Sequence, residues 1–342
     1  MCQESLIAYL DTSVNGEATS FQKIDTEQTD MFGNKARKGQ LPMEVEHGRK
    51  IIVERKDIEK FIREGTAAIE HDELKEAGKL ISKDYALPES IRNYAKELDK
   101  ALANIRICDP AIGSGAFPVG MMNEIVKARE ILAIYLPNAK DHTAYELKRH
   151  AIQECIYGVD IEHSAIDIAK LRLWLSLIVD EDDFYKIKPL PNLDYKIVRG
   201  NSLIGMPDNS FRDVKLEDEI KELEDELFDE RDKDKKDKLR SKIEKKIRQL
   251  LDSAEQFSGY KVDFDFKVFF SKVFREKKGF DIVIGNPPYK IESKSEQIFY
   301  KGYSTINCGD LYAYFFERSI KQLLKTNGTL SFITASLYIK GL

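Results

Sequence analysis

From residue 104 onward, the chain alternates between short apolar runs and longer amphipathic stretches. The apolar runs are predicted to be β-strands, some of which run into turn residues, and they occupy residues 104–110, 155–161, 194–203, 280–289 and 328–336. Between them, apolar side chains recur at helical spacing over residues 118–136, 163–181 and 310–328. Strands that alternate with helices predict an α/β fold with a doubly wound, mainly parallel sheet.

Residues 1–103 carry a different pattern, mainly helical and polar. Leu6, Ile7 and Leu10 share one helical face, and Pro88 with Ser90 marks a later helix start. The stretch 12–48 is rich in Gly, Thr, Asn and Gln and is predicted to be a loop, and 50–66 is predicted to be a short strand or turn that runs into a helix. We therefore expect a helical N-terminal region, 1–103, before an α/β core, 104–342.

A charged segment at about 213–251 interrupts the core pattern. Residues 213–230 hold ten acids and two lysines, whereas residues 231–248 hold ten bases and four acids. Leucines and isoleucines recur at helical spacing in both halves. Opposite charges on successive halves favour a helical hairpin inserted into the core, with one continuous solvated helix as the alternative. On either interpretation the charge run is expected to be scaffold.

Composition narrows the class of protein. The 342 residues carry a formal net charge of −5, and 42% of them are hydrophobic. This balance excludes a wholly basic protein that coats phosphates, but it leaves room for an enzyme with a local nucleic-acid-binding surface. The four cysteines are scattered, so neither a disulfide framework nor a metal site is predicted. No apolar run is long enough to span a membrane, and no signal peptide is evident, so a cytoplasmic protein is expected.

The first motif with chemical content is DPAIGSGAF, residues 109–117, between a predicted strand and helix. Gly113 and Gly115 let the backbone approach a ligand closely, and the next helix offers free N–H groups. The spacing matches neither GxGxxG nor the P-loop. Asp109 suits a ligand with a positive amino or sulfonium group better than a pyrophosphate. A tight turn without a ligand is the alternative.

Two weaker signals follow the next strands. Asp160, in GVDI, stands where an acid can accept both ribose hydroxyls, although a helix cap explains it equally well. Asn201, in GNSL, could bond an adenine edge or could serve only as a turn residue.

The strongest motif is Asn286-Pro287-Pro288-Tyr289, directly after the apolar run FDIVIG. Two prolines stiffen the loop and remove two N–H donors, which leaves backbone carbonyls as acceptors. With the Asn286 side-chain carbonyl, these acceptors can hold an exocyclic amino group and direct its lone pair at an electrophile. Tyr289 can stack on a planar base or amide.

In this order, DPAIGSGAF, GVDI, GNSL and NPPY resemble the amino-group methyltransferases that use S-adenosylmethionine. More narrowly, the chain resembles the N6-adenine DNA methyltransferase part of type IIG restriction-modification enzymes. SLIAYLD, LPES, PVGMMNEI, FDFKVFFSKVF and DLYAYFFERSI extend this resemblance over nearly the whole chain. It implies a Rossmann-like methyltransferase fold.

The resemblance also implies roles. The loop from Asp109 to Gly115 would hold the methionine part of the cofactor, Asp160 its ribose, and Ile161 and Asn201 its adenine. Asn286 and the Pro287 carbonyl would accept hydrogen bonds from the N6 amino group, while Tyr289 stacks on the flipped-out adenine. Direct transfer would need no metal. The full set implied for the cofactor is Asp109, Pro110, Ala111, Gly113, Gly115, Phe117, Asp160, Ile161, Asn201 and Ser202, and for catalysis Asn286, Pro287, Pro288 and Tyr289.

The chain also departs from this pattern. A Tyr-Thr-Pro segment that helps close the cofactor pocket in such enzymes is not found before the first helix, and the sequence stops after GTLSFIT. We therefore expect a monomeric core truncated at both ends. Its partner would be double-stranded DNA, bound through a recognition domain outside this chain. Methylation by the chain alone would then be weak or absent.

Three alternatives remain at this point. A protein glutamine-amide methyltransferase also uses NPPY, but such enzymes are compact, unlike this chain. An inactive remnant or interaction subunit of a defence complex fits the missing ends. A nicotinamide-dependent dehydrogenase is the weakest alternative, because GxGxxG is absent.

Overall fold

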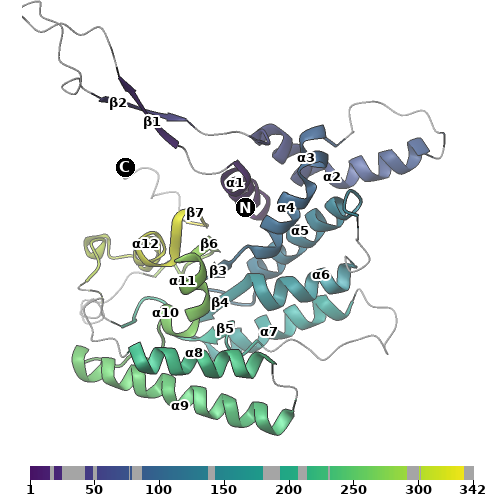
Figure 1. Ribbon diagram of the computed structural model, residues 1–342. Coiled ribbons are helices and arrows are strands. Elements are labelled where there is room, and N and C mark those ends of the chain that lie inside the picture. Colours follow the sequence, from purple (N-terminus) through teal and green to yellow (C-terminus); the bar gives the residue numbers. More distant parts are fainter. Residues whose placement is uncertain are drawn as a thin grey trace, which may run out of the picture.

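A five-stranded parallel sheet forms the centre of the protein, as seen in a computed structural model (Figure 1). The structure describes residues 1–15, 19–24, 43–48, 52–76, 78, 87–137, 143–179, 193–206, 214–229, 232–290, 300 and 302–334. The strand order is β5-β4-β3-β6-β7. The strands are β3 (Ile107–Asp109), β4 (Ile156–Asp160), β5 (Ile197–Arg199), β6 (Phe280–Gly285) and β7 (Leu324–Phe332). The α/β fold with a doubly wound parallel sheet is thus confirmed.

The chain leaves β3 in one direction, toward β4 and β5, and later returns to place β6 on the other side of β3. The connections are helical: α5 (Ala116–Ala133), α6 (Ala144–His150) and a π-turn (Ala151–Cys155) precede β4, α7 (His163–Ile178) precedes β5, and α12 (Leu311–Arg318) with a second π-turn (Ser319–Leu323) precedes β7. The reversal between β3 and β6 creates a topological switch point, where open α/β sheets bind their ligands.

Strand side chains alternate between two buried faces, as expected for a parallel sheet covered on both sides. Ile107, Ile156 and Ile197 belong to a core shared with α5 and α7. Their neighbours Cys108, Tyr157 and Val198 pack on the opposite face. There the cover is aromatic and comes from the segment around α10 (Phe266–Phe269) and α11 (Ser271–Lys277), namely Phe264, Phe266 and Phe270.

The N-terminal helices share the core of the sheet. These are α1 (Cys2–Asn15), α2 (Arg55–Glu76), α3 (Glu89–Asn93) and α4 (Ala95–Asn104). Leu6, Phe61 and Leu98 are fully buried in the same cluster as the strand isoleucines. The Ser5 hydroxyl also lies 2.8 Å from that of Ser331 on β7. Among the described residues, therefore, this region covers one face of the sheet.

The expectation of a loop over residues 12–48 is wrong in part. Helix α1 continues to Asn15, and β1 (Thr19–Ile24) pairs antiparallel with β2 (Met43–Gly48). Each strand is only six residues long, and the surrounding stretch is so polar that no strand pattern can be recognised in the sequence. Residues 16–18 and 25–42 lie outside the described part of the chain.

The charged insertion forms two helices that lie side by side (Figure 1), α8 (Val214–Asp229) and α9 (Lys233–Ser258). Ile220 and Leu227 of α8 are buried against Leu239, Ile243 and Ile247 of α9. An ion pair between Glu219 and Lys246 joins the acidic helix to the basic one. These contacts favour the hairpin interpretation over one continuous helix, although α9 extends seven residues beyond the expected end.

The predicted helix over 310–328 is too long. Helical structure ends at Leu323, and β7 begins at Leu324. The pairing of β6 with β7 shifts from Phe280↔Leu324 to Ile282↔Thr329, so three additional residues bulge from β7. Asn327 has a φ of 62°, which accommodates this bulge. The Asn-Gly pair therefore lies inside the strand, where sequence reasoning had placed the end of the helix.

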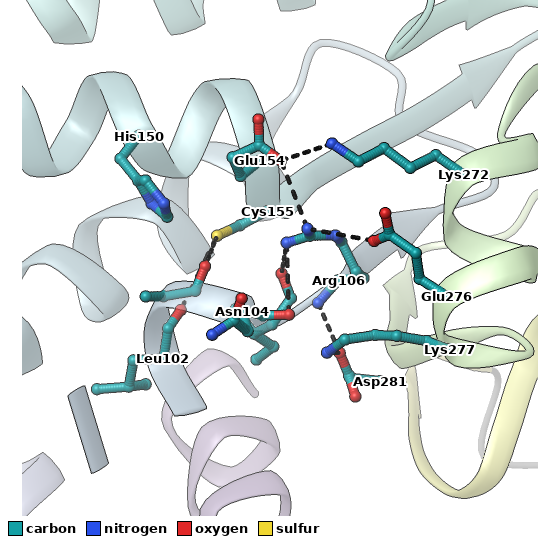
Figure 2. Close-up of polar contacts among 12 residues, drawn as sticks. Leu102, Asn104, Arg106, His150, Glu154, Cys155, Lys272, Glu276, Lys277 and Asp281 are labelled. Carbon is teal, nitrogen blue, oxygen red and sulfur yellow. Dashed lines mark hydrogen bonds and ion pairs between the residues drawn. The ribbon is translucent and has the colours of Figure 1, made fainter. Parts of the chain in front are cut away.

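The amino-terminal edge of the sheet holds a network of charges (Figure 2). Asp281, which is 1% exposed, accepts hydrogen bonds at 2.7 Å from the backbone N–H of Arg106 and at 2.5 Å from Lys277. Lys325 of β7 forms an ion pair with the same carboxylate at 2.5 Å. The buried Arg106 guanidinium reaches Glu154 at 3.4 Å. The network connects β3, β6, β7 and α11 at the edge opposite the sequence motifs.

Candidate active site

All four motifs lie at the carboxyl ends of the strands. Asp109 ends β3, Asp160 ends β4, and Asn201 and Asn286 follow β5 and β6. Because β3 and β6 are neighbours, the glycine loop and the NPPY loop lie side by side at the switch point. Gly285 shows how close they are, since a Cβ at this position would lie 2.6 Å from Asp109 Oδ1. The motifs predicted from the sequence are therefore brought together at one edge of the sheet.

The glycine loop is held against β4 by hydrogen bonds from two of its backbone N–H groups. Ile112 N–H donates to the Val159 carbonyl at 2.9 Å, and Gly113 N–H donates to Asp160 Oδ2 at 2.8 Å. Gly113 and Gly115 have φ values of 51° and 81°, in the left-handed region that favours glycine. A Cβ on Gly115 would lie 3.1 Å from the Cβ of Ala169, whereas one on Gly113 would meet no described atom within 4 Å. Gly115 thus permits the packing of α5 on α7, and Gly113 leaves open space above the loop.

Asp109 is a buried acid below this loop. Its Oδ1 accepts a hydrogen bond from Ala111 N–H at 3.0 Å, while its buried Oδ2 has no hydrogen-bond partner among the described residues. Burial, with a smaller contribution from the Asp160 charge, raises the pKa of Asp109 to about 8. A positive charge or a hydrogen-bond donor that binds next to Asp109 would therefore stabilise its ionised form.

Asp160 orders the turn between β4 and α7. Its Oδ1 accepts from Glu162 N–H at 3.0 Å, and its Oδ2 holds Gly113. Each carboxylate oxygen has a second acceptor site, so a pair of hydroxyls can still bind here. Ile161, next to it, is 57% exposed, which leaves an apolar surface beside the carboxylate.

The GNSL loop after β5 is a turn organised by its own side chains. Asn201 Oδ1 accepts from the N–H groups of Leu203 at 2.9 Å and Ile204 at 3.3 Å, as the turn interpretation predicts. The buried Ser202 hydroxyl donates to the Pro110 carbonyl at 2.6 Å. Ser202 therefore joins the β5 loop to the β3 loop.

The NPPY loop presents Asn286, Pro288 and Tyr289 at the surface and buries Pro287. The Tyr289 hydroxyl oxygen lies 3.0 Å from Asn286 Oδ1 and 2.8 Å from the Ile333 carbonyl oxygen. The Tyr289 ring is 51% exposed and meets the ring of Tyr312 edge to face, with 6.3 Å between centroids. An acceptor-rich loop and an exposed aromatic face thus stand next to the buried Asp109.

The remaining residues of the predicted cofactor set support the loops from below. Ala111 packs against the cluster formed by Leu203, Tyr300, Tyr314 and Phe315. Phe117, in the first turn of α5, packs against the main core.

Sequence reasoning missed several residues that hold the site. Arg172 of α7 donates to the hydroxyl of Ser114 at 3.1 Å. Tyr303 donates to the Leu203 carbonyl at 2.7 Å. Asp265 accepts from Met206 N–H at 3.1 Å, three residues after the GNSL motif. Arg172 and Tyr303 belong to no motif, and only their three-dimensional contacts reveal them. The FDF of FDFKVFF contains Asp265 and was the one available signal.

Comparison with known proteins decides the family. A sequence profile of the Eco57I restriction-modification methylase family matches residues 154–342, more than half of the chain. This chain belongs to the Eco57I restriction-modification methylase family. The matched segment includes β4 through β7, and with them Asp160, Asn201 and the NPPY loop.

Two longer proteins are similar to this family member. One is a putative type II restriction enzyme and methyltransferase, RM.MjaORFECS2P of Methanocaldococcus jannaschii. It is 29% identical over 331 residues of alignment, and the match covers 73% of this chain and 27% of the relative. The other is the type II restriction enzyme and methyltransferase RM.Eco57I of Escherichia coli. It is 29% identical over 284 residues of alignment, and the match covers 75% of this chain and 23% of the relative. The chain thus spans about a quarter of the length of these relatives.

Among the described residues, no helix is long and apolar enough to cross a membrane.

Proposed function

We propose that this chain is the methyltransferase unit of a restriction-modification protein, and that it transfers a methyl group from S-adenosylmethionine to the N6 amino group of adenine in DNA. The observation that carries the proposal is the juxtaposition of the Asp109 loop and the Asn286 loop at the switch point of a family member. This arrangement supports a role for the first loop in binding the cofactor and for the second in accepting hydrogen bonds from the amino group.

The residues at this edge fit S-adenosylmethionine. The buried Asp109 lacks a partner for Oδ2 among the described residues and suits a positively charged ligand. Gly113 leaves room for the methionine part above the loop, and Asp160 retains acceptor sites for the ribose hydroxyls. Ile161 offers an exposed apolar contact for the adenine. When bound, the cofactor supplies an electrophilic methyl group.

The protein side of the reaction is positioning and polarisation. A target adenine must leave the duplex before its amino group can reach the loop. Asn286 and the Pro287 carbonyl then accept hydrogen bonds from the two amino hydrogens, which directs the nitrogen lone pair toward the methyl donor. The exposed face of Tyr289 stacks on the extruded base.

Two measurements test this function. Calorimetry with S-adenosylmethionine reports cofactor binding, and a single-turnover assay with excess protein, radiolabelled cofactor and duplex DNA makes even slow transfer visible. We expect label at N6 of adenine. Label in a glutamine-containing peptide and none in DNA would point to the protein amide reaction, and absence of cofactor binding would point to an inactive remnant.

Asn286→Ala separates chemistry from binding in the same assays. It should abolish transfer while leaving the cofactor Kd within about twofold, because the amide would contact the base and not the cofactor. Equal loss of transfer and of cofactor binding would assign Asn286 a structural role instead.

A further inference from the structure

The Tyr289 hydroxyl lies between two oxygen atoms, each within hydrogen-bond distance. One is the Asn286 side-chain oxygen at 3.0 Å and the other is the Ile333 carbonyl oxygen at 2.8 Å. A hydroxyl has a single proton and so can satisfy only one acceptor at a time. The second contact would then pair oxygen with oxygen.

The Ile333 carbonyl is the fixed partner of the two. Ile333 N–H donates to the Gly285 carbonyl at 3.1 Å, so the backbone that leads into this carbonyl continues the pairing of β6 with β7 one residue past Phe332. A backbone carbonyl can only accept, and it lies at the shorter distance. The Tyr289 hydroxyl therefore donates its proton in a hydrogen bond to the Ile333 carbonyl, and the Tyr289 oxygen can accept a hydrogen bond from Asn286.

The Asn286 amide can supply the matching donor. Its NH2 and oxygen ends are nearly equal in size, and only hydrogen bonding decides between the two orientations. Turning the amide by half a rotation places Nδ2 next to the Tyr289 hydroxyl. The result is a chain in which Asn286 Nδ2–H donates to Tyr289 Oη and Tyr289 Oη–H donates to the Ile333 carbonyl. All three groups are then satisfied.

We propose that the Tyr289 hydroxyl is a positioning group that orients the Asn286 amide, fixing its carbonyl oxygen away from Tyr289 and toward an incoming amino group. This role rests on the proposed function and adds to it, since stacking requires only the ring of Tyr289. The hydroxyl acts through Asn286 and touches no substrate. The hydroxyl thereby disfavours the opposite orientation, in which the Asn286 NH2 group would face the incoming amino group, a donor against a donor.

The orientation can be measured without any substrate. In a deuterated, 15N-labelled protein, the side-chain amide protons of Asn286, assigned with Asn286→Ala, should show one proton protected from exchange by the bond to Tyr289. Tyr289→Phe keeps the ring and removes the acceptor, so both protons should exchange at the rate of an exposed amide. Tyr312→Phe removes a hydroxyl from the neighbouring ring and should leave the Asn286 signals unchanged.

Unchanged Asn286 signals in Tyr289→Phe would overturn the proposal, whether or not the protein methylates DNA. A wild-type protein that shows the protected amide but transfers no methyl group would instead count against the proposed function alone.

Kinetics give the second readout. Tyr289→Phe should lower kcat about tenfold, the effect expected for one orienting hydrogen bond, with KM for DNA and the cofactor Kd unchanged. Tyr289→Ala removes the stacking ring as well and should also raise KM. A Tyr289→Phe variant with wild-type kcat would mean that the hydroxyl does not orient the amide during the reaction.

Discussion

Single residues at the switch point show what the motifs could and could not disclose. Residue type and spacing identified Asp109, Gly113, Gly115 and Asn286 as candidate site residues. They could not show that the second oxygen of Asp109 is buried without a partner among the described residues, or that Tyr289 bonds Ile333, the residue after β7. Such partners lie far apart in sequence, and no local pattern encodes them.

Asp109 should make stability fall as pH rises. Its pKa of about 8 lies well above the ordinary value near 4, so the folded state binds this proton more tightly than the unfolded state. The stability contributed by the protonated group is complete below pH 4 and is lost as pH rises toward 8. Asparagine cannot ionise, so Asp109→Asn should melt at a higher temperature than the wild type at pH 8. Melting curves from pH 5 to 8 would show a widening gap, and a constant gap would contradict the assigned pKa.

Gly115→Ala should destabilise the fold more than Gly113→Ala. Both positions have positive φ, which costs an alanine about 1–2 kcal/mol, but only at Gly115 would the new Cβ also press on Ala169, at 3.1 Å. Urea denaturation should show losses of about 2–4 and 1–2 kcal/mol, respectively. Equal losses would mean that the contact between α5 and α7 relaxes freely.

At the scale of elements, prediction depended on how regular each element is. The strands before the motifs are short apolar runs, and their existence was predicted correctly. The end of the last helix was not, because Leu323 and Leu324 continue a helical apolar pattern although Leu324 already pairs with Phe280. The pair β1–β2 was missed for the opposite reason, since its six-residue strands lie within a polar stretch.

The contact of α7 with the glycine loop gives a prediction at this scale. Arg172 donates to Ser114 and so fixes the loop from the side of α7. Arg172→Ala should raise the Kd for S-adenosylmethionine about three- to tenfold, the usual effect of one hydrogen bond, without a measurable change in melting temperature. Asp167→Ala on the same helix, which loses only an exposed contact with His163, is the matched control. Calorimetry with equal Kd values for both variants would show that Arg172 does not order the loop.

At the scale of the whole molecule, the parallel sheet separates two edges. The sequence motifs lie at the carboxyl-terminal edge, and the charge network lies at the amino-terminal edge. The alternating pattern predicted the parallel sheet and a helical N-terminal region, 1–103, but it did not show how the two pack. Leu6, Phe61 and Leu98 lie in the same core as the strand isoleucines, and a parallel sheet must be covered on both faces. Which helices provide that cover depends on long-range packing that sequence periodicity does not specify.

The charge network at the amino-terminal edge should be essential for folding and remote from chemistry. Asp281→Ala would leave Lys277, Lys325 and the Arg106 N–H without their buried partner, and removal of one member of such a group costs about 3–5 kcal/mol. Urea denaturation measures this loss. Under conditions where the variant is folded, its cofactor Kd should match that of the wild type. A change in Kd without a change in stability would contradict this separation of the two edges.

The hairpin also separates the polypeptide into two parts, each of which contains one of the two main motif loops. Residues up to Asp229 include β3, β4 and β5 with the glycine loop, and residues from Asp232 include β6 and β7 with the NPPY loop. The acidic α8 and the basic α9 end the first piece and begin the second. A gene divided between these two positions would therefore encode two polypeptides with complementary helices at the break. Their reassembly would make the proposed methyl transfer conditional on the association of two separately expressed fragments.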